Sequence, residues 1–236
     1  VYAETAFEEE QSLLLLGNDV SSRYTRRTPG EFEKIARYIL KTGQAKQGNY
    51  MVFFPSYKMM QQVYEVFWEL NDDKMECIIQ QSGMKEAERE EFLGEFCRER
   101  GKTLIAFCVM GGIFGEGIDL KKEQLIGAII VGTGIPQISN EREILMNYYD
   151  KRSGEGFDYA YRYPGMNKVL QAAGRVIRTV EDIGVIELLD ERFMQSDYRK
   201  LFPKEWENRK SCSIDSVESY LEQFWKSKEM TGNELP

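Results

Sequence analysis

The residues best suited to chemistry lie in one segment, 171–178, which reads QAAGRVIR. The sequence predicts a helix over about 167–178, on which Gln171, Gly174, Arg175 and Arg178 fall at i, i+3, i+4 and i+7 and share one face. Two guanidinium groups on one helix edge suit a triphosphate whose negative charge grows in a transition state. The alternative interpretation is a surface helix whose arginines form salt bridges.

A glycine-rich segment follows a predicted strand that ends at Cys108. Residues 111–119 read GGIFGEGID, with four glycines among the first seven positions. Glycines such as Gly111 and Gly112 let a backbone approach a ligand closely. Glu116 and Asp119 could accept hydrogen bonds from ribose hydroxyls or hold an arginine in place. The alternative is a flexible loop, although such a loop does not need acids between its glycines.

Ser56 and Tyr57 stand where another predicted strand ends and a helix begins. Backbone N–H groups and a hydroxyl at such a position can meet a phosphate. The alternative is a helix that Ser56 merely caps.

Two other segments resemble parts of a nucleotide-hydrolysing site but have the wrong context. Gly101-Lys102-Thr103 precedes a strand, whereas a P-loop follows one. Asp190 and Glu191 resemble a Walker B acid pair, yet no P-loop accompanies them. The chain has no histidine, and its four cysteines form no CxxC pair, so we predict no metal site and expect the cysteines to be buried.

Length and composition indicate a globular protein. The chain has 236 residues, of which 42% are hydrophobic and 30% charged, and its net charge is −8. That charge argues against a protein that coats nucleic acid through bulk electrostatic attraction, although residues 151–178 include six basic residues and two acidic ones.

No apolar run is long enough to cross a membrane, and there is no secretory signal, so we expect a cytoplasmic location. Because an initiator Met is absent, we expect a piece of a longer protein.

Strands and helices alternate along the sequence, which predicts an α/β fold with a mostly parallel sheet and helices on both faces. Ligands of such folds bind beyond the carboxyl ends of the strands. The predicted helices lie at about 29–42, 56–67, 85–100, 140–150, 167–178 and 217–225, and we expect a short disordered tail near 229–236. The predicted strands are Ser12 to Leu16, Tyr50 to Phe54, Glu76 to Ile79, Thr103 to Cys108, Ala128 to Val131 and Val185 to Leu189.

The three segments occur in the order FPSY (54–57), GEGID (115–119) and QAAGRVIR (171–178), which resembles motifs IV, V and VI of superfamily 2 helicases in the form of the XPD and DinG group. The resemblance extends from about Leu13 to Trp225. It implies that residues 1–236 form one RecA-like lobe, the second motor domain of an ATP-dependent DNA helicase that moves 5′ to 3′ on single strands. The resemblance also implies a role in DNA repair.

The resemblance also implies roles for individual residues. Arg178 would be the arginine finger on the γ-phosphate, Arg175 a second phosphate contact or finger, and Gln171 a nucleotide or interdomain sensor. The remaining ATP-binding residues would be Gly174, Glu116, Gly117 and Asp119, and the DNA-binding residues would be Ser56, Tyr57, Gly111 and Gly112.

The implied partners are single-stranded DNA, ATP with Mg²⁺, and the first motor domain of the same polypeptide. In that family the first motor domain carries the Walker motifs and any iron–sulfur cluster, so we expect this chain alone to be inactive and to bind no metal.

Two alternatives to the helicase interpretation stay open. One is a non-hydrolysing nucleic-acid or partner-binding module. The other is a glycosyltransferase or dehydrogenase lobe, although Gln137 stands where the third glycine of a dinucleotide fingerprint would follow Gly132 and Gly134.

Overall fold

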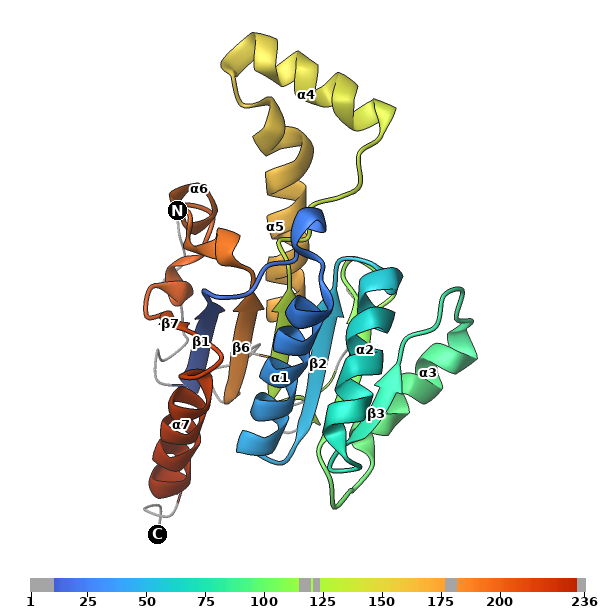
Figure 1. Cartoon of the computed structure of the whole chain (residues 1–236), viewed down its shortest axis with the longest axis vertical. Coiled ribbons are helices and arrows are strands. Elements are labelled where there is room, and N and C mark those ends of the chain that lie inside the picture. The colour runs from blue at the N-terminus through green and yellow to red at the C-terminus, as the bar shows by residue number, and fades with distance from the viewer. Residues whose placement is uncertain (1–10, 115–119, 121–123, 177–181, 233–236) are drawn as a thin grey trace.

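The sheet has seven strands, and every adjacent pair is parallel (Figure 1). In this computed structural model, residues 11–114, 120, 124–176 and 182–232 are described. The strand order across the sheet is β3-β4-β2-β5-β6-β1-β7. The strands are β1 (Ser12–Gly17), β2 (Asn49–Phe54), β3 (Glu76–Ile79), β4 (Leu104–Val109), β5 (Gly127–Val131), β6 (Gly184–Leu189) and β7 (Lys210–Cys212).

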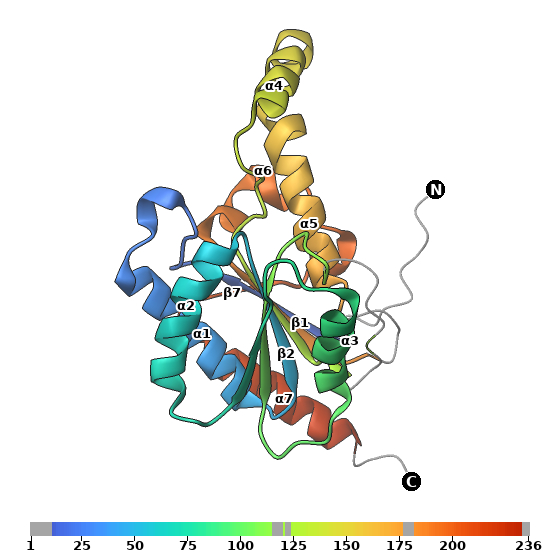
Figure 2. The ribbon, with the colours of Figure 1, turned by 90° about the vertical axis from the view of Figure 1, so that its right-hand side faces the viewer.

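Helices cover both faces of this sheet (Figure 2). On one face lie α1 (Pro29–Ala45), α2 (Tyr57–Asn71) and α7 (Val217–Gly232), and on the other lie α3 (Glu86–Gly94) and α5 (Tyr163–Ala173). The parallel α/β fold is therefore confirmed. The shorter elements are α6 (Ser196–Arg199), a π-helix (Asp158–Arg162) and 3₁₀ turns at Tyr24–Arg26, Glu95–Cys97, Glu191–Met194 and Lys204–Trp206.

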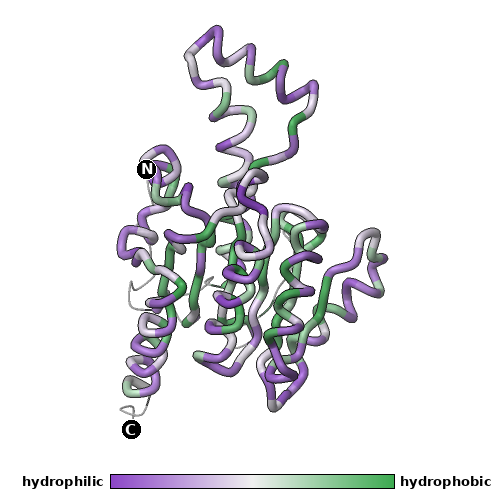
Figure 3. The backbone as a smooth tube through the Cα atoms, viewed as in Figure 1, coloured by the Kyte–Doolittle hydropathy of each residue, from purple (hydrophilic) through white to green (hydrophobic). Residues whose placement is uncertain are grey.

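The strands divide the apolar core into two layers because successive side chains point to opposite faces. In β1, Leu15 faces α1 and α7, whereas Leu14 and Leu16 face α5. In β2, Phe53 and Phe54 divide in the same way. Hydropathy along the backbone follows this pattern, since the strands are mostly hydrophobic and the helices alternate (Figure 3). Burial of both faces explains why the strands read as continuous apolar runs in the sequence.

The six predicted strands are confirmed, but several helix boundaries differ. Helix α1 continues past Gly43 to Ala45, so Gly43 does not mark its end. Gly43 instead allows close packing, because a Cβ atom there would come within 2.6 Å of Met75 Sδ. Helix α5 begins at Tyr163 and ends at Ala173, so the helix predicted over 167–178 is wrong at both ends. Helix α7 continues to Gly232, so residues 229–232 of the expected disordered tail are helical.

Helix α4 (Asn140–Ser153) stands away from the sheet with the π-helix and the start of α5 (Figure 1). Ser139 caps it by accepting a hydrogen bond from Arg142 N, and none of its residues is buried. Among the described helices, none is both long and apolar enough to span a bilayer.

One acidic residue lies in the apolar layer beneath α1. Glu187, in the middle of β6, is 0% exposed, and its Oε1 accepts a hydrogen bond of 2.7 Å from Thr42 Oγ1. Its other carboxyl oxygen has no partner. Burial raises the pKa of Glu187 to about 8, although the bond from Thr42 lowers it. The folded protein therefore keeps this carboxyl protonated at pH values where the unfolded chain has released the proton.

This difference in pKa predicts a pH-dependent stability. Between the ordinary Glu pKa of about 4.3 and about 8, the folded state binds one more proton than the unfolded state at this site. The free energy of unfolding should fall with rising pH in that window, with a contribution of about 1.4 kcal/mol per pH unit from Glu187. Glu187→Gln should lose this contribution in urea unfolding measured at a series of pH values. Glu222→Gln, at an exposed position of α7, is the control and should follow the wild type. Parallel curves for Glu187→Gln and the wild type would contradict the prediction.

Candidate nucleic-acid interface

Parallel pairing places the segments that follow β2, β3 and β4 at one edge of the sheet, the carboxyl edge. Ser56 ends the connection from β2 and caps α2, since its Oγ accepts a hydrogen bond of 3.3 Å from Met59 N. Tyr57 is the first residue of α2, and 38% of its surface is exposed. The predicted cap is therefore confirmed. The positive end of the α2 dipole faces the same edge.

The turn after β4 carries the next two predicted residues. Gly111 has φ of +67°, a conformation that glycine adopts without strain, and Gly112 N donates to Val109 O at 3.2 Å. The turn is joined to β2 through Met110 N, which donates to Phe54 O at 2.8 Å.

Two side chains that the sequence analysis did not single out also reach this turn. Gln80, directly after β3, donates from Nε2 to Tyr57 Oη at 2.8 Å and accepts at Oε1 from Val109 N at 2.8 Å. Lys168 of α5 packs against Gly111, where a Cβ atom would lie 3.0 Å from Lys168 Cε. Burial lowers the pKa of Lys168, and the charge of Arg142 lowers it further. The structure thus brings Tyr57, Gly111 and Gly112 together through Gln80 and adds a cation.

A second group at the carboxyl edge is built on Asp190, which follows β6 and is 0% exposed. Its carboxylate accepts hydrogen bonds from Ser22 N at 2.9 Å and Ser22 Oγ at 2.6 Å, and from Arg192 Nε and Nη2, both at 2.8 Å. Burial opposes ionisation of Asp190, but the hydrogen bonds and charge of Arg192, with the bond from Ser22, hold its pKa below the usual value. The carboxylate is thus occupied in holding the chain after β1 against the chain after β6.

These contacts shape a cavity of about 170 Å³ lined by three arginines. Arg192 is paired with Asp190, and Arg23 lies 3.4 Å from Glu191, but no carboxylate among the described residues pairs with Arg27. Arg27 Nε donates to Ser22 O at 3.2 Å, and its guanidinium carbon lies 5.6 Å from the centre of the Tyr24 ring. Burial lowers the pKa of Arg27, with a smaller contribution from the charge of Arg192.

The same cavity contains an unsatisfied hydroxyl group. Thr133, after β5, is 2% exposed, and its Oγ1 has no hydrogen-bond partner. A cation without a carboxylate partner and a buried hydroxyl without a hydrogen bond both suit an oxyanion such as a phosphate. Sequence reasoning missed this group because its members come from three separate connections.

Gln171, Gly174 and Arg175 of the predicted QAAGRVIR segment lie at the C-terminal end of α5. Helix α5 ends at Ala173, and the chain continues in a tighter turn, with Arg175 N donating to Ala172 O at 3.3 Å. Gln171 and Gly174 are exposed, and Arg175 is half-buried. The predicted single helical face is therefore wrong beyond Ala173. Arg178, Glu116, Gly117 and Asp119 lie outside the described residues.

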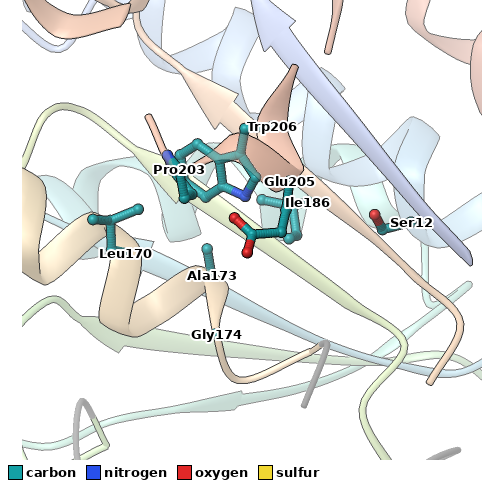
Figure 4. Close-up of a pocket in the computed structure, with 8 residues that line it drawn as sticks. All are labelled: Ser12, Leu170, Ala173, Gly174, Ile186, Pro203, Glu205 and Trp206. Carbon is teal, nitrogen blue, oxygen red and sulfur yellow. The ribbon is translucent and has the colours of Figure 1, made fainter. Parts of the chain in front are cut away.

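A cavity of about 310 Å³ lies beside this end of α5 (Figure 4). Leu170 and Ala173 of α5 and Gly174 directly after it line one side, and Pro203 and Trp206 line the opposite side. Its lining is mainly apolar, with Glu205 as its single ionisable group among the described residues.

The cysteines are all free. Cys108 and Cys212 are buried and Cys77 is partly buried, but Cys97 is exposed, so the expectation that all four are buried is wrong for Cys97. Within the described part of the chain, no group of three or more His, Cys, Asp or Glu residues could hold a metal ion.

Comparison with solved structures shows that the fold is RecA-like. A structure of XPD helicase matches with a TM-score of 0.69 and 24% identity, over 86% of this chain and 35% of that one. The chain belongs to the helicase C-terminal domain family, whose model matches residues 39–209. The resemblance to the C-terminal domain of XPD-like superfamily 2 helicases is therefore confirmed.

Two curated relatives illustrate the family. The ATP-dependent DNA helicase XPD of Sulfolobus acidocaldarius is 28% identical over 194 residues, which are 78% of this chain and 32% of the relative. The regulator of telomere elongation helicase 1 of Pongo abelii is 29% identical over 207 residues, which are 79% of this chain and 16% of the relative. The chain thus spans a third or less of the length of these helicases.

The Asp190 network predicts a large loss of stability when it is broken. Asp190→Asn leaves the mostly buried Arg192 without its carboxylate partner, and the free energy of unfolding should fall by about 3–5 kcal/mol. Glu191→Gln is the matched control, because it removes a neighbouring carboxylate that is 36% exposed and should cost less than about 1 kcal/mol. Denaturant titration measures both changes, and equal losses would contradict the account of Asp190.

Proposed function

We propose that residues 1–236 form the second motor lobe of an ATP-dependent DNA helicase that moves 5′ to 3′ on single-stranded DNA. The observation that carries the proposal is the course of α5. This helix places Lys168 against Gly111 at the carboxyl edge, and Gln171 and Arg175 follow within about two turns. One rigid element thus joins the candidate DNA-binding residues to the candidate nucleotide-binding segment.

On the DNA side, the backbone of the single strand runs along the carboxyl edge. Ser56, Tyr57, Gly111 and Gly112 contact phosphates, with help from the α2 N-terminus and from Lys168. The cavity around Arg27 and Thr133 binds a further phosphate. The acidic net charge of the chain is compatible with this track, because the cations that matter are concentrated at one edge.

On the nucleotide side, this lobe completes an ATP site that the first motor domain of the same polypeptide holds. Arg178 and Arg175 neutralise the charge that develops on the phosphates during hydrolysis. Gln171 senses the nucleotide, Gly174 lets the segment approach it, and the remaining contacts come from Glu116, Gly117 and Asp119. The ligands of Mg²⁺ come from the first motor domain, as the family resemblance implies.

Movement follows from closure and opening of the two lobes. When ATP draws the arginines toward the first domain, α5 carries the carboxyl edge with it, so the two lobes approach each other along the single-stranded DNA.

Roles in DNA repair and a cytoplasmic location stay predictions of the sequence.

The arginine finger gives the direct test of the nucleotide role. In the full-length protein, Arg178→Ala should lower ATP hydrolysis stimulated by single strands about 10³-fold or more, with DNA binding retained. Arg199→Ala, at an exposed position of α6, is the control and should leave turnover unchanged. Equal turnover in the Arg178→Ala and wild-type proteins would instead favour the non-hydrolysing binding module.

The phosphate cavity gives a separate test of the DNA role. Arg27→Ala should weaken binding of single strands similarly for all sequences and should reduce the slope of log K against log salt by about one unit. Fluorescence anisotropy over a range of salt concentrations measures this slope. Arg37→Ala removes one exposed charge from α1, where Arg37 pairs with Glu33, and should leave the slope unchanged. Identical slopes for the Arg27→Ala and wild-type proteins would remove the cavity from the proposed DNA track.

A further inference from the structure

Gln80 connects two of the candidate DNA-binding segments, and its environment is nearly closed. It is 2% exposed, and its backbone N donates to Phe107 O at 2.9 Å, which fixes it at the end of β3 beside β4. Its side chain reaches Tyr57 of α2 on one side and Val109, directly before the glycine turn, on the other. Gly112 lies so close that a Cβ atom there would be 3.1 Å from Gln80 Nε2.

The chemistry of these partners fixes which way the amide group points. A backbone N–H can only donate, so the group that faces Val109 N must be the acceptor, Oε1. Nε2 then faces Tyr57, and because an amide nitrogen can only donate, Tyr57 Oη must accept. The phenolic proton of Tyr57 is left pointing away from Gln80. Tyr57 is 38% exposed, so this proton is available to a ligand at the carboxyl edge.

We infer that Gln80 is a positioning residue that holds the Tyr57 hydroxyl as a hydrogen-bond donor toward a phosphate oxygen of the single strand. The same side chain also holds Val109, directly before the Gly111–Gly112 turn, so it fixes the distance between Tyr57 and this turn. A phosphate oxygen only accepts hydrogen bonds, so a Tyr57 hydroxyl that donated its proton to residue 80 could not also donate it to the phosphate. The inference rests on the proposed contact between Tyr57 and DNA and adds the residue that sets its polarity.

Gln80→Glu tests this polarity with almost no change in shape. The carboxylate can still accept from Val109 N, but it also accepts from Tyr57, and it thereby takes the proton intended for the phosphate. In the full-length protein, affinity for a fluorescein-labelled oligodeoxythymidine should fall about tenfold, the order expected for one lost hydrogen bond. Gln81→Glu is the matched control, because it adds the same charge at the next, exposed position and should have a much smaller effect.

Repeating the Gln80 substitutions in a Tyr57→Phe background separates the effect of hydrogen-bond direction from the effect of added charge. Tyr57→Phe should itself weaken binding, and Gln80→Glu should add little to it, because the phenolic proton is already gone. Gln80→Met is a further variant that removes both hydrogen bonds without adding charge. It should also weaken binding, and less so in the Tyr57→Phe background. Thermal unfolding of each variant shows that the protein remains folded while binding is measured.

The outcomes distinguish the inference from the proposal beneath it. If Tyr57→Phe binds as the wild type does, the proposed contact between the Tyr57 hydroxyl and DNA is wrong, and the inference falls with it. If Tyr57→Phe weakens binding but Gln80→Glu matches Gln81→Glu, the contact stands and the role of Gln80 is overturned. Equal losses from Gln80→Glu in both backgrounds would reduce its effect to charge and would also overturn the inference.

Discussion

Parallel pairing of seven strands is the constraint on which the rest of this structure depends. The chain leaves every strand at the same edge of the sheet, so segments that are far apart in the sequence lie close together there. The turn after β4, the cap of α2 and the Asp190 network all lie at this edge. Because both faces of a parallel sheet must be covered by helices, the edges are the places where polar groups can gather without a large cost of burial.

Helix α5 turns this geometry into a mechanical connection. Met166, Val169, Ala172 and Ala173 pack into the core, so the helix cannot shift without disturbing the layer beneath it. Lys168 of this helix lies at the glycine turn, and Gly174 and Arg175 directly follow its C-terminal end. In the proposed motor, a displacement at the nucleotide therefore reaches the DNA track through packed side chains.

The sequence predicted the elements that depend on burial and repetition. Six strands are apparent as apolar runs, most of them buried on both faces although β3 is only partly buried, and Ser56 is recognisable as a cap from its place before an amphipathic helix. Strand β7 was missed because Lys210 and Ser211 are exposed and the strand has three residues. The end of α5 was placed too late because helical spacing continues formally past Gly174, whereas a glycine there favours the end of the helix.

The site was predicted less completely than the fold. Tyr57, Gly111 and Gly112 belong to motifs, and the structure brings them together. Gln80, Arg27 and Thr133 belong to none, and their importance arises only from neighbours contributed by other connections. Asp190 is recognisable in the sequence as an acid after a strand, but its structural role depends on Ser22 and Arg192, which donate hydrogen bonds to its carboxylate.

The most direct test of the account is a structure of the full-length protein with single-stranded DNA and ADP–beryllium fluoride, which mimics the bound triphosphate. The account predicts that Arg178 contacts the beryllium fluoride group from the second lobe while phosphates of the strand lie against Tyr57, the Gly111–Gly112 turn and Arg27. A strand bound at another surface of this lobe, or a nucleotide site to which residues 171–178 make no contact, would contradict it.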